Sequence, residues 1–462
     1  MNGVGRFLAC LAGLSMMTGA LDGQPLLNAA DRDDLDAVRE LVEAGAGVDE
    51  ANRHGVTALS LACRNGSESM IRLLLEKGAD PNGKLSGGET VLMTAARTGR
   101  PGGVRALLEK GAQVDAREGR GQTALMWAAA EGHLEVVELL IEQGADIRVR
   151  LASGFDALLF AVREGHGDVV KVLIEAGAEV SQAAYPKKPN GRSMRPGTAP
   201  LMLALENGHF ELALALVDAG ADPNDQRSGY APLHALTWVR KSVRGDGVDG
   251  MPPPVTTGAV TSLEFARELV KRGAKVNLRL KKGSGFAEKM NPKAATPFFM
   301  AAETCDLDLL KLLVELGADP SIPNADQTSP LLIACGIGVN APGEEAGTED
   351  DALEVVPYLL ELGADINVVD KKGETVMHGA AYKAAPKLMR LLDERGADIT
   401  VWNRKNAYGR TPLRIARGYR RGNFRPIVEM MEAVEGLMRK HGVEVPPRGD
   451  GRPDTSRKGY GK

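Results

Sequence analysis

The sequence is poor in aromatic residues, which make up 4% of its 462 residues. A core of this size must therefore be built mainly from Leu, Ala, Val and Ile. Cysteine is scarce as well, with four in the chain and no Cys-x-x-Cys spacing, so we expect neither a disulfide framework nor a zinc or haem motif. Neither sign of charge dominates, because the net charge is −4, and this excludes a global attraction to nucleic acid or to an anionic membrane.

Long apolar runs are missing too, since no stretch approaches the roughly 18 consecutive apolar residues that a membrane-spanning helix needs. The N-terminus has one positive charge at Arg6, a short apolar run over residues 7–17, and small residues over 18–20. This pattern predicts a signal peptide over residues 1–20, which would place the chain in a periplasm or outside the cell. The alternative is the apolar start of a capping helix, and the chain would then be cytoplasmic.

Glycine, in contrast, is abundant at 55 residues, and many glycines mark a repeat. Gly-Ala pairs follow apolar helical runs at regular places, beginning at Gly45, Gly78, Gly111, Gly144, Gly177, Gly220, Gly273, Gly317, Gly363 and Gly396. Each of the first four steps is 33 residues, as is the last, and the others are longer. A fixed period with insertions predicts a solenoid in which each unit covers the apolar face of its neighbour.

The repeating unit is clearest over residues 121–147, which read GQTALMWAAAEGHLEVVELLIEQGADI. Thr123 is placed to cap a first helix through its side-chain oxygen. Gly132 and His133 then form a turn, and a second helix follows with an apolar stripe that includes Leu140. Gly144 ends this helix, because glycine adopts the left-handed conformation at little cost.

These units resemble ankyrin repeats in their order of Gly-x-Thr-Pro-Leu-His-x-Ala-Ala, Gly-His and Gly-Ala-Asp. The resemblance covers roughly residues 24–440, or about eleven units, within an array that we place at residues 21–440. It implies an all-α solenoid of helix-turn-helix units with finger loops, and a protein that binds another protein without catalysis or a cofactor. Atypical units near residues 24–54 and 406–440 are expected to cap the array, and residues 441–462 to form a disordered tail.

Four insertions interrupt the pattern, at residues 181–196, 239–261, 279–294 and 337–351. The first and third lie between units and lengthen fingers, and each has a net charge of +4. The second and fourth lie inside a unit, between its helices, and the fourth has a charge of −5 from five Asp and Glu residues. The basic fingers predict electrostatic steering of an acidic partner. The alternative is that these long surface loops are simply polar and solvated.

Residues that could carry chemistry recur at fixed places in the repeat. His133, His166 and His209 lie in the Gly-His turn, whereas His234 and His378 occupy the His of Thr-Pro-Leu-His. Such histidines are predicted to be structural and to bind backbone groups of the loops. Cys63 and Cys335 replace a small Ala of a first helix, and Cys305 takes the place of a turn glycine. No HExxH, GxGxxG, P-loop or GxSxG motif is present, so an enzyme would need a site built within the insertions.

A partner-binding face is expected at the finger tips and on the exposed side of the first helices. Its candidate residues are Arg53, Val56, Arg64, Arg120, Gln122, Phe155, Arg163, Tyr230, Trp238, Tyr382 and Lys383. Four lysines of the basic fingers are expected to steer the partner, namely Lys187, Lys188, Lys281 and Lys282. Binding of a nucleic acid or another polyanion through these fingers is the alternative, although few aromatic residues accompany the lysines.

Overall fold

The computed structural model describes residues 24–187, 194–241, 254–282, 290–339, 342, 347–419 and 426–447. These residues form 23 α-helices and no β-strand, with isolated β-bridges between Lys84 and Thr90 and between Ala184 and Thr198. The all-α repeat solenoid expected from the sequence is thus confirmed. The chain divides into two compact units, Met1–Ala221 and Asp222–Lys462.

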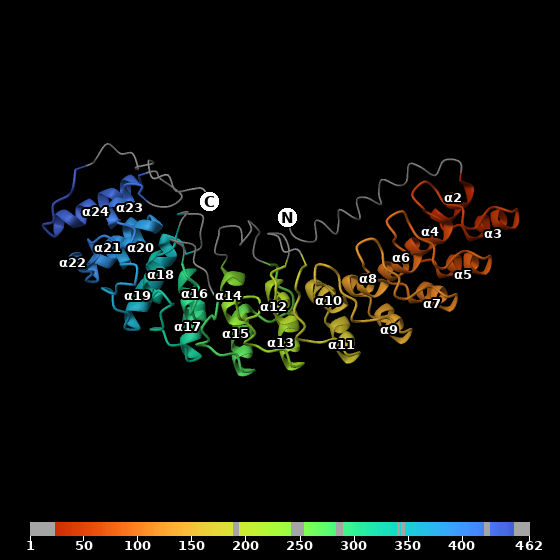
Figure 1. Ribbon diagram of the computed structural model, residues 1–462, viewed down its shortest axis with the longest axis horizontal. Helices are drawn as coiled ribbons and strands as arrows, with labels where there is room; N and C mark the ends of the chain where they lie inside the picture. Colours follow the sequence, from red (N-terminus) through yellow and green to blue (C-terminus); the bar gives the residue numbers. More distant parts are fainter. Residues whose placement is uncertain are drawn as a thin grey trace. The chain divides into compact units, whose positions relative to one another are not determined.

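The first unit contains six helix pairs (Figure 1). They are α2 (Pro25–Asp31) with α3 (Leu35–Glu43), α4 (Ala58–Asn65) with α5 (Glu68–Glu76), α6 (Val91–Thr98) with α7 (Pro101–Glu109), α8 (Ala124–Glu131) with α9 (Leu134–Glu142), α10 (Ala157–Glu164) with α11 (Gly167–Glu175), and α12 (Pro200–Glu206) with α13 (Phe210–Asp218). First helices pack on first helices, so that α8 lies between α6 and α10. The second helices α5, α7, α9, α11 and α13 form the other row of this unit (Figure 1).

Local sequence explains where these helices begin and end. The side-chain oxygens of Thr57, Thr90 and Thr123 accept a hydrogen bond from the third backbone N–H of α4, α6 and α8, which satisfies a donor that has no partner inside the helix. The glycines that follow these helices adopt left-handed conformations, for example Gly132 with a φ of 77°. Short first helices with two fixed ends therefore recur at each repeat.

The two helices of a repeat bury different amounts of surface. Helix α8 is apolar all round and buries every residue from Ala124 to Ala130, because other helices flank it on both sides. Helix α9 buries only one stripe, in which Leu140 is fully buried as predicted. The core of each unit thus runs continuously between the two rows of helices.

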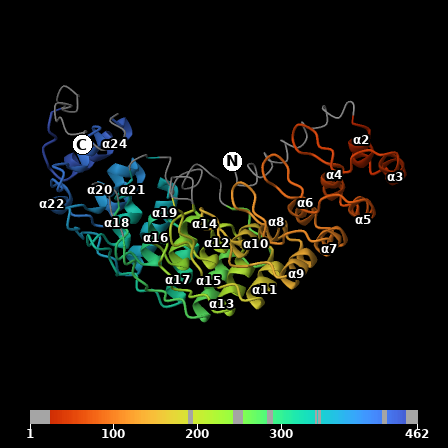
Figure 2. The same cartoon turned by 45° about the vertical axis from the view of Figure 1, so that its right-hand side comes forward.

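The second unit contains five helix pairs and one extra helical turn. The pairs are α14 (Pro232–Arg240) with α15 (Ser262–Lys271), α16 (Pro297–Glu303) with α17 (Leu307–Glu315), α18 (Pro330–Cys335) with α19 (Glu349–Glu361), α20 (Val376–Lys383) with α21 (Pro386–Glu394), and α23 (Pro412–Ala416) with α24 (Val428–Lys440). The extra turn, α22 (Ile399–Trp402), begins where Asp398 accepts a hydrogen bond from the backbone N–H of Thr400. With six pairs in the first unit, eleven pairs are described, in agreement with the expected number of repeats. Figure 2 shows the fingers and helix pairs from another angle.

Two of the predicted insertions are shorter than expected where the structure describes them. Residues Glu349, Asp350 and Asp351, counted as insertion, form the first turn of α19, where carboxylates interact favourably with the helix dipole. Thr348 caps this turn in a reciprocal capping box with Asp351. Likewise Arg240 still belongs to α14. The acidic charge assigned to the fourth insertion therefore lies largely in a helix.

The predicted signal peptide at residues 1–20 and residues 448–462 of the predicted tail lie outside the described residues. Residues 441–447 of the predicted tail are described, and Arg417 donates hydrogen bonds to the carbonyls of Pro446 and Pro447. Among the helices that the structure describes, none combines the length and the apolar character needed to cross a bilayer. The same residues contain no group of three or more His, Cys, Asp and Glu side chains able to hold a metal ion.

Candidate functional site: fingers, first helices and a charged cluster

The turn histidines of the first unit have a structural role, as predicted. The Nε2 atoms of His133 and His166 lie 2.8 and 3.0 Å from the carbonyl oxygens of Arg97 and Ala130, each in the preceding repeat. His209 contacts the carbonyl of Arg163 in the same way at 3.0 Å. A Cβ at Gly99 would lie 2.3 Å from the ring of His133, so the glycine of one repeat makes room for the histidine of the next. These imidazoles therefore tie successive repeats together.

The remaining predicted structural residues are buried. His234 and His378 have lowered pKa values of about 4 because burial disfavours the charged imidazole. Their Nε2 atoms contact backbone carbonyls, for example that of Ala295 at 3.2 Å from His234. Burial also raises the pKa of the thiols of Cys63 and Cys335, which makes them poor nucleophiles.

The finger tips of the first unit place several predicted residues in solvent. Arg53, Arg120 and Lys187 are exposed. Successive fingers are joined by backbone hydrogen bonds, such as Ser86 N to His54 O at 3.0 Å and Lys187 N to Ala152 O at 2.9 Å. Lys188 lies outside the described residues. The tips therefore form a connected edge from which basic side chains project.

A cluster of aromatic rings and an arginine lies on the first-helix side of the fifth repeat, at α10. Phe155 and Phe160 are in tilted contact with ring centroids 5.1 Å apart. The guanidinium of Arg163 lies 5.3 Å from the centroid of Phe155 and 5.1 Å from that of Phe160, within range of a cation–π interaction. Phe155 and Arg163 are partly exposed, as the sequence predicted, whereas Phe160 is buried.

A second aromatic pair lies at the first repeat of the second unit. Tyr230 precedes α14 and Trp238 lies near its end, and their rings meet edge to face at a centroid distance of 4.8 Å. Both side chains are partly exposed. Aromatic pairs in this arrangement gain about 0.5–1.5 kcal/mol beyond the burial of their area. The pair is thus held in a fixed orientation at the surface.

The predicted exposure of four residues of the partner-binding face is wrong. Val56, Gln122, Tyr382 and Lys383 are each at most 9% exposed. Arg64 is partly exposed but forms an ion pair with Asp31 of the preceding repeat. The position between the finger glycine and the capping residue is thus buried at Val56 and Gln122 but partly exposed at Phe155, so the repeat pattern alone does not decide its exposure.

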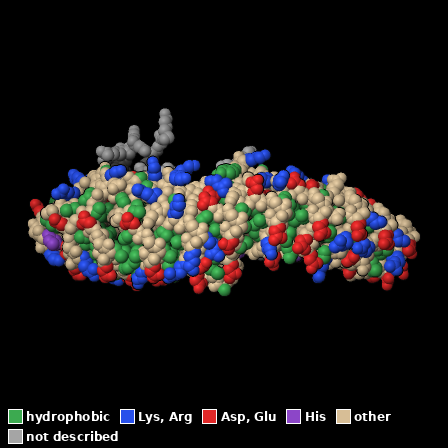
Figure 3. All heavy atoms as spheres, turned by 90° about the horizontal axis from the view of Figure 1, so that it is seen from below, with side chains coloured by type: hydrophobic (Ala, Val, Ile, Leu, Met, Phe, Trp, Pro, Cys, Tyr) green, Lys and Arg blue, Asp and Glu red, His purple; other side chains and the backbone are tan. Residues whose placement is uncertain are grey.

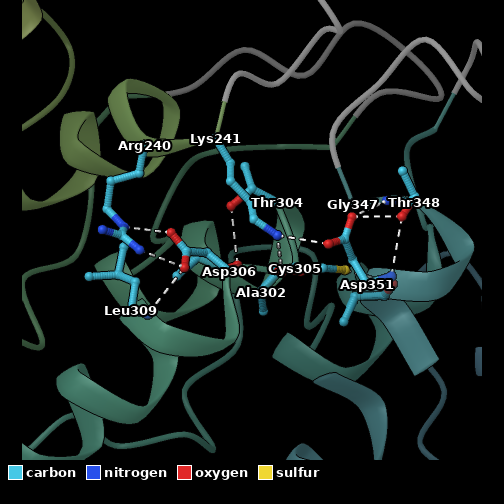
Figure 4. A network of polar contacts seen from close by, with 12 residues as sticks. Arg240, Lys241, Ala302, Thr304, Cys305, Asp306, Leu309, Gly347, Thr348 and Asp351 are labelled. Carbon is cyan, nitrogen blue, oxygen red and sulfur yellow. Dashed lines mark hydrogen bonds and ion pairs between the residues drawn. The ribbon is translucent and has the colours of Figure 1, made fainter. Parts of the chain in front are cut away.

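The structure reveals a charged cluster in the second unit that the sequence analysis missed (Figure 4). Arg240, at the end of α14, forms a bidentate ion pair with Asp306, with Nε–Oδ2 and Nη2–Oδ1 distances of 2.6 and 3.0 Å. Asp306 is 2% exposed and also caps α17 through the N–H of Leu309. Next to it, Lys241 donates to the carbonyl of Cys305 at 3.0 Å and to Asp351 at 2.8 Å.

Lys383 also belongs to this cluster, and its contacts there explain why it is not on the surface. Its Nζ donates to the carbonyl of Gly347 and lies 3.7 Å from the Sγ atom of Cys305. The pKa of Asp351 is lowered. Burial by itself would raise this pKa, but hydrogen bonds from Lys241 and Thr348 to the carboxylate outweigh that effect. The cluster links four consecutive repeats at the helix turns, the same side on which the first unit uses histidines.

A sequence signal for this cluster exists. The turn of the α16–α17 repeat reads Thr304-Cys305-Asp306 in place of Gly-His, and Cys305 keeps the left-handed conformation of the lost glycine with a φ of 48°. Where a repeat loses its Gly-His pair next to an insertion, a charged contact takes over the role of the imidazole. A count of departures from the motif would have pointed to Arg240 and Asp306.

A buried carboxyl group lies between the fingers of the last two repeats. Glu374 is 3% exposed, and its Oε1 accepts hydrogen bonds from Tyr382 at 3.3 Å and Asn406 at 3.0 Å. Asp370, 6% exposed, lies in the same finger and accepts a hydrogen bond from Thr328 at 2.8 Å. Burial raises the pKa of Glu374 to about 7, and the negative charge of Asp370 adds to this rise.

The face formed by the second helices has a different character. In Figure 3, which views the chain from that side, acidic and basic side chains are mixed. On α5 and α7, for example, Arg72 pairs with Glu68 at 2.8 Å and with Glu109 at 3.3 Å. Charges on this face largely neutralise one another, in contrast to the basic finger tips.

Comparisons with known proteins agree with the repeat architecture. Family models of ankyrin repeats in three copies match residues 8–85, 26–118, 114–184 and 150–227, and a model of many copies matches residues 298–342. Similar proteins include alpha-latrocrustotoxin-Lt1a of Latrodectus tredecimguttatus, 30% identical over 166 residues, which cover 35% of this chain and 11% of the toxin. The B-cell lymphoma 3 protein homolog of Mus musculus is 36% identical over 139 residues, which cover 30% of this chain and 28% of the homolog.

Transient receptor potential cation channel subfamily A member 1 of Homo sapiens is 26% identical over 175 residues, which cover 32% of this chain and 15% of the channel. The chain thus spans less than a third of the length of each of these three relatives. What the proteins share is the repeat array, and such arrays generally bind other proteins. The family matches, the eleven helix pairs and the finger loops together show that this chain belongs to the ankyrin-repeat family.

Proposed function

We propose that this protein is a non-enzymatic scaffold that binds another protein through its finger tips and the exposed side of its first helices. The observation that supports this most is the pair of Tyr230 and Trp238, partly exposed and held edge to face at the base of a finger. Trp, Tyr and Arg dominate the energetics of protein interfaces. Because the chain has few aromatic residues, their placement at the surface favours a binding role over packing alone.

The first unit supports the same face with Phe155 and Arg163. Lys187, Lys281 and Lys282 are exposed on the fingers and are positioned to attract an acidic partner over a distance. In this proposal the aromatic side chains supply affinity and the lysines supply speed of association.

The test begins with an affinity purification of partners by the mature chain from its own compartment. Binding kinetics of the recovered partner are then measured for Tyr230→Ala with Trp238→Ala. We expect a faster off-rate, with an affinity loss of about 30-fold, because truncating a hot-spot residue costs about 2 kcal/mol or more. Tyr358→Ala, on the second helix α19, is the matched control and should bind like the parent.

The charge part of the proposal has its own readout. Changing Lys187, Lys188, Lys281 and Lys282 to Ser should lower the on-rate at low salt and have little effect at high salt, where exposed charges are screened. If both sets of variants remain folded and bind the partner like the parent, the finger and first-helix face is not the binding face.

Two other functions are weaker. An enzyme would need several titratable groups around one pocket, and the described part of the chain places its strongly perturbed groups in structural contacts such as the buried Glu374. Binding of nucleic acid through the basic fingers would need exposed aromatic rings for stacking. Among the described exposed large hydrophobic side chains, Tyr185, 58% exposed, is the one aromatic ring.

We also propose that the chain is exported after loss of residues 1–20, on the basis of the apolar run between Arg6 and the small residues at 18–20. N-terminal sequencing of the natively expressed protein tests this proposal. An intact Met1 in the cytoplasm would contradict it.

A further inference from the structure

The fingers of the second unit form one connected edge. Backbone hydrogen bonds join each finger to the next, with Ala325 N to Lys293 O at 2.9 Å, Lys371 N to Asp326 O at 2.9 Å and Ala407 N to Lys372 O at 2.7 Å. At the start of this edge, the backbone N–H of Lys281 donates to the side chain of Gln226 at 2.9 Å. Side chains that project from these tips therefore follow one another along a continuous strip of surface.

This strip carries a row of exposed cations, which we call the finger stripe. Its members are Lys281, Lys282, Lys293, Lys371, Arg404 and Lys405, all exposed. In the described part of the chain, none of the six forms an ion pair, although Lys371 donates one hydrogen bond to the carbonyl of Ala325. Three of the six residues lie in fingers of ordinary length, outside the predicted insertions, namely Lys371, Arg404 and Lys405.

Two carboxylates act on the stripe, since the charge of Asp326 interacts with Lys371 and that of Asp398 interacts with Arg404. Asp326 pairs with Lys372 at 2.7 Å and accepts a hydrogen bond from Asn291 at 3.1 Å. Asp370 and Glu374 are buried under the fingers. The described tips thus carry more positive than negative charge outward, although the chain as a whole has a net charge of −4.

The surroundings of the stripe favour an acidic protein segment over a nucleic acid as the ligand. Its lysines pair with carboxylates and phosphates alike, so the discrimination depends on the neighbouring side chains. Proteins that bind single strands stack bases on exposed aromatic rings. In the described residues of this unit the large exposed apolar side chains are Val255, Val369 and Val428, and the ring of Tyr408 has the guanidinium of Arg410 over it at 5.5 Å.

We infer that the finger stripe is a docking surface for an extended, Asp- and Glu-rich segment of a partner protein. Its carboxylates would pair with the exposed cations of successive fingers. Val369, 47% exposed next to Lys371, offers an apolar contact within the stripe. The inference rests on the proposed scaffold function and specifies the chemistry of the partner at the second unit.

The test measures binding of labelled poly-L-glutamate of about 20 residues to the full chain by fluorescence anisotropy over a range of salt concentrations. We expect binding that weakens as salt rises, because exposed charges are screened. Replacing Lys293, Lys371 and Lys405 with Ser should weaken it about tenfold, the combined effect of losing three exposed ion pairs. The control replaces Lys311, Arg390 and Arg395, three exposed cations of the second-helix side, with Ser and should change the affinity less than about twofold.

Three outcomes would overturn the inference. They are no binding of poly-L-glutamate, equal weakening by the stripe and control variants, and tighter binding of an oligothymidylate of the same length, which would indicate a nucleic-acid site. The scaffold proposal is judged separately by Tyr230 and Trp238. If the Tyr230→Ala and Trp238→Ala variant no longer binds the native partner and the parent does not bind poly-L-glutamate, the scaffold function is supported and the docking of an acidic segment is refuted.

Discussion

The buried carboxyl group of Glu374 predicts how the stability of the second unit depends on pH. Its pKa is raised from 4.5 to about 7, so the folded state holds the proton more tightly than the unfolded chain does. Stability is therefore lost as pH rises from about 4.5 to about 7 and stays low above that range. At about 1.4 kcal/mol for each tenfold change in proton affinity, the ionised group destabilises the fold by about 3 kcal/mol.

Glu374→Gln isolates this effect. The amide oxygen can still accept the hydrogen bonds of Tyr382 and Asn406, and the charge is gone. We expect the stability of the variant relative to the parent to increase by about 2.5 kcal/mol between pH 5 and pH 8, because part of the effect has already occurred at pH 5. Hydrogen exchange of the amides of α20 and α23, corrected for the intrinsic pH dependence of exchange, measures this change locally.

Glu89→Gln is the matched control, because Glu89 occupies the same motif position in the first unit. It is partly exposed and pairs with Arg97 at 3.4 Å, so its relative stability should change by less than about 1 kcal/mol over the same range. Burial also raises the pKa of Asp370, which lowers stability with rising pH in the same direction as Glu374. Asp370 is present in both the parent and the Glu374→Gln variant, so the comparison between them isolates Glu374. An equal difference between parent and Glu374→Gln at pH 5 and pH 8 would refute the assignment of a raised pKa to this group.

Three further predictions concern the contacts between repeats. Leu140→Ala should cost about 2–5 kcal/mol, with lost exchange protection centred on residues 120–180 rather than spread over the array. His166→Ala removes the contact with the carbonyl of Ala130 and should destabilise the first unit by about 1–3 kcal/mol in urea unfolding, because a buried acceptor loses its partner; no measurable loss would show that the histidine is not a link. Asp306→Ala removes the partner of Arg240 and the cap of α17, so a loss of about 3–5 kcal/mol is expected, and Asp308→Ala on the exposed side of the same helix should cost much less.

Much of the fold could be predicted because each repeat is specified locally. The capping threonines, the left-handed glycines and the apolar stripe through Leu140 act within about 33 residues, and neighbours only stack on what they form. The same locality explains the prediction that His133 and His166 are structural, which the contacts with Arg97 and Ala130 confirm.

The candidate face was harder to predict because exposure depends on neighbouring repeats. The repeat pattern places Val56 and Gln122 beside the finger turn, yet both side chains are buried in the stack. The repeat pattern predicts that Lys383 is exposed at a helix end, but its side chain is buried and lies 3.7 Å from Cys305, where the Gly-His turn is missing. Which side chains remain accessible is set by the packing of adjacent repeats.

By itself, then, the sequence determined the all-α repeat, the number of units, the position of each helix turn and the absence of recognisable catalytic motifs, because these follow from short-range patterns of capping, turn and apolar residues. Only the tertiary structure decided that Arg240 pairs with Asp306, 66 residues away, that Glu374 is buried, and that the cations of separate fingers line up in one stripe. Those features arise when repeats stack, since stacking brings side chains from different units together and controls how much water reaches them.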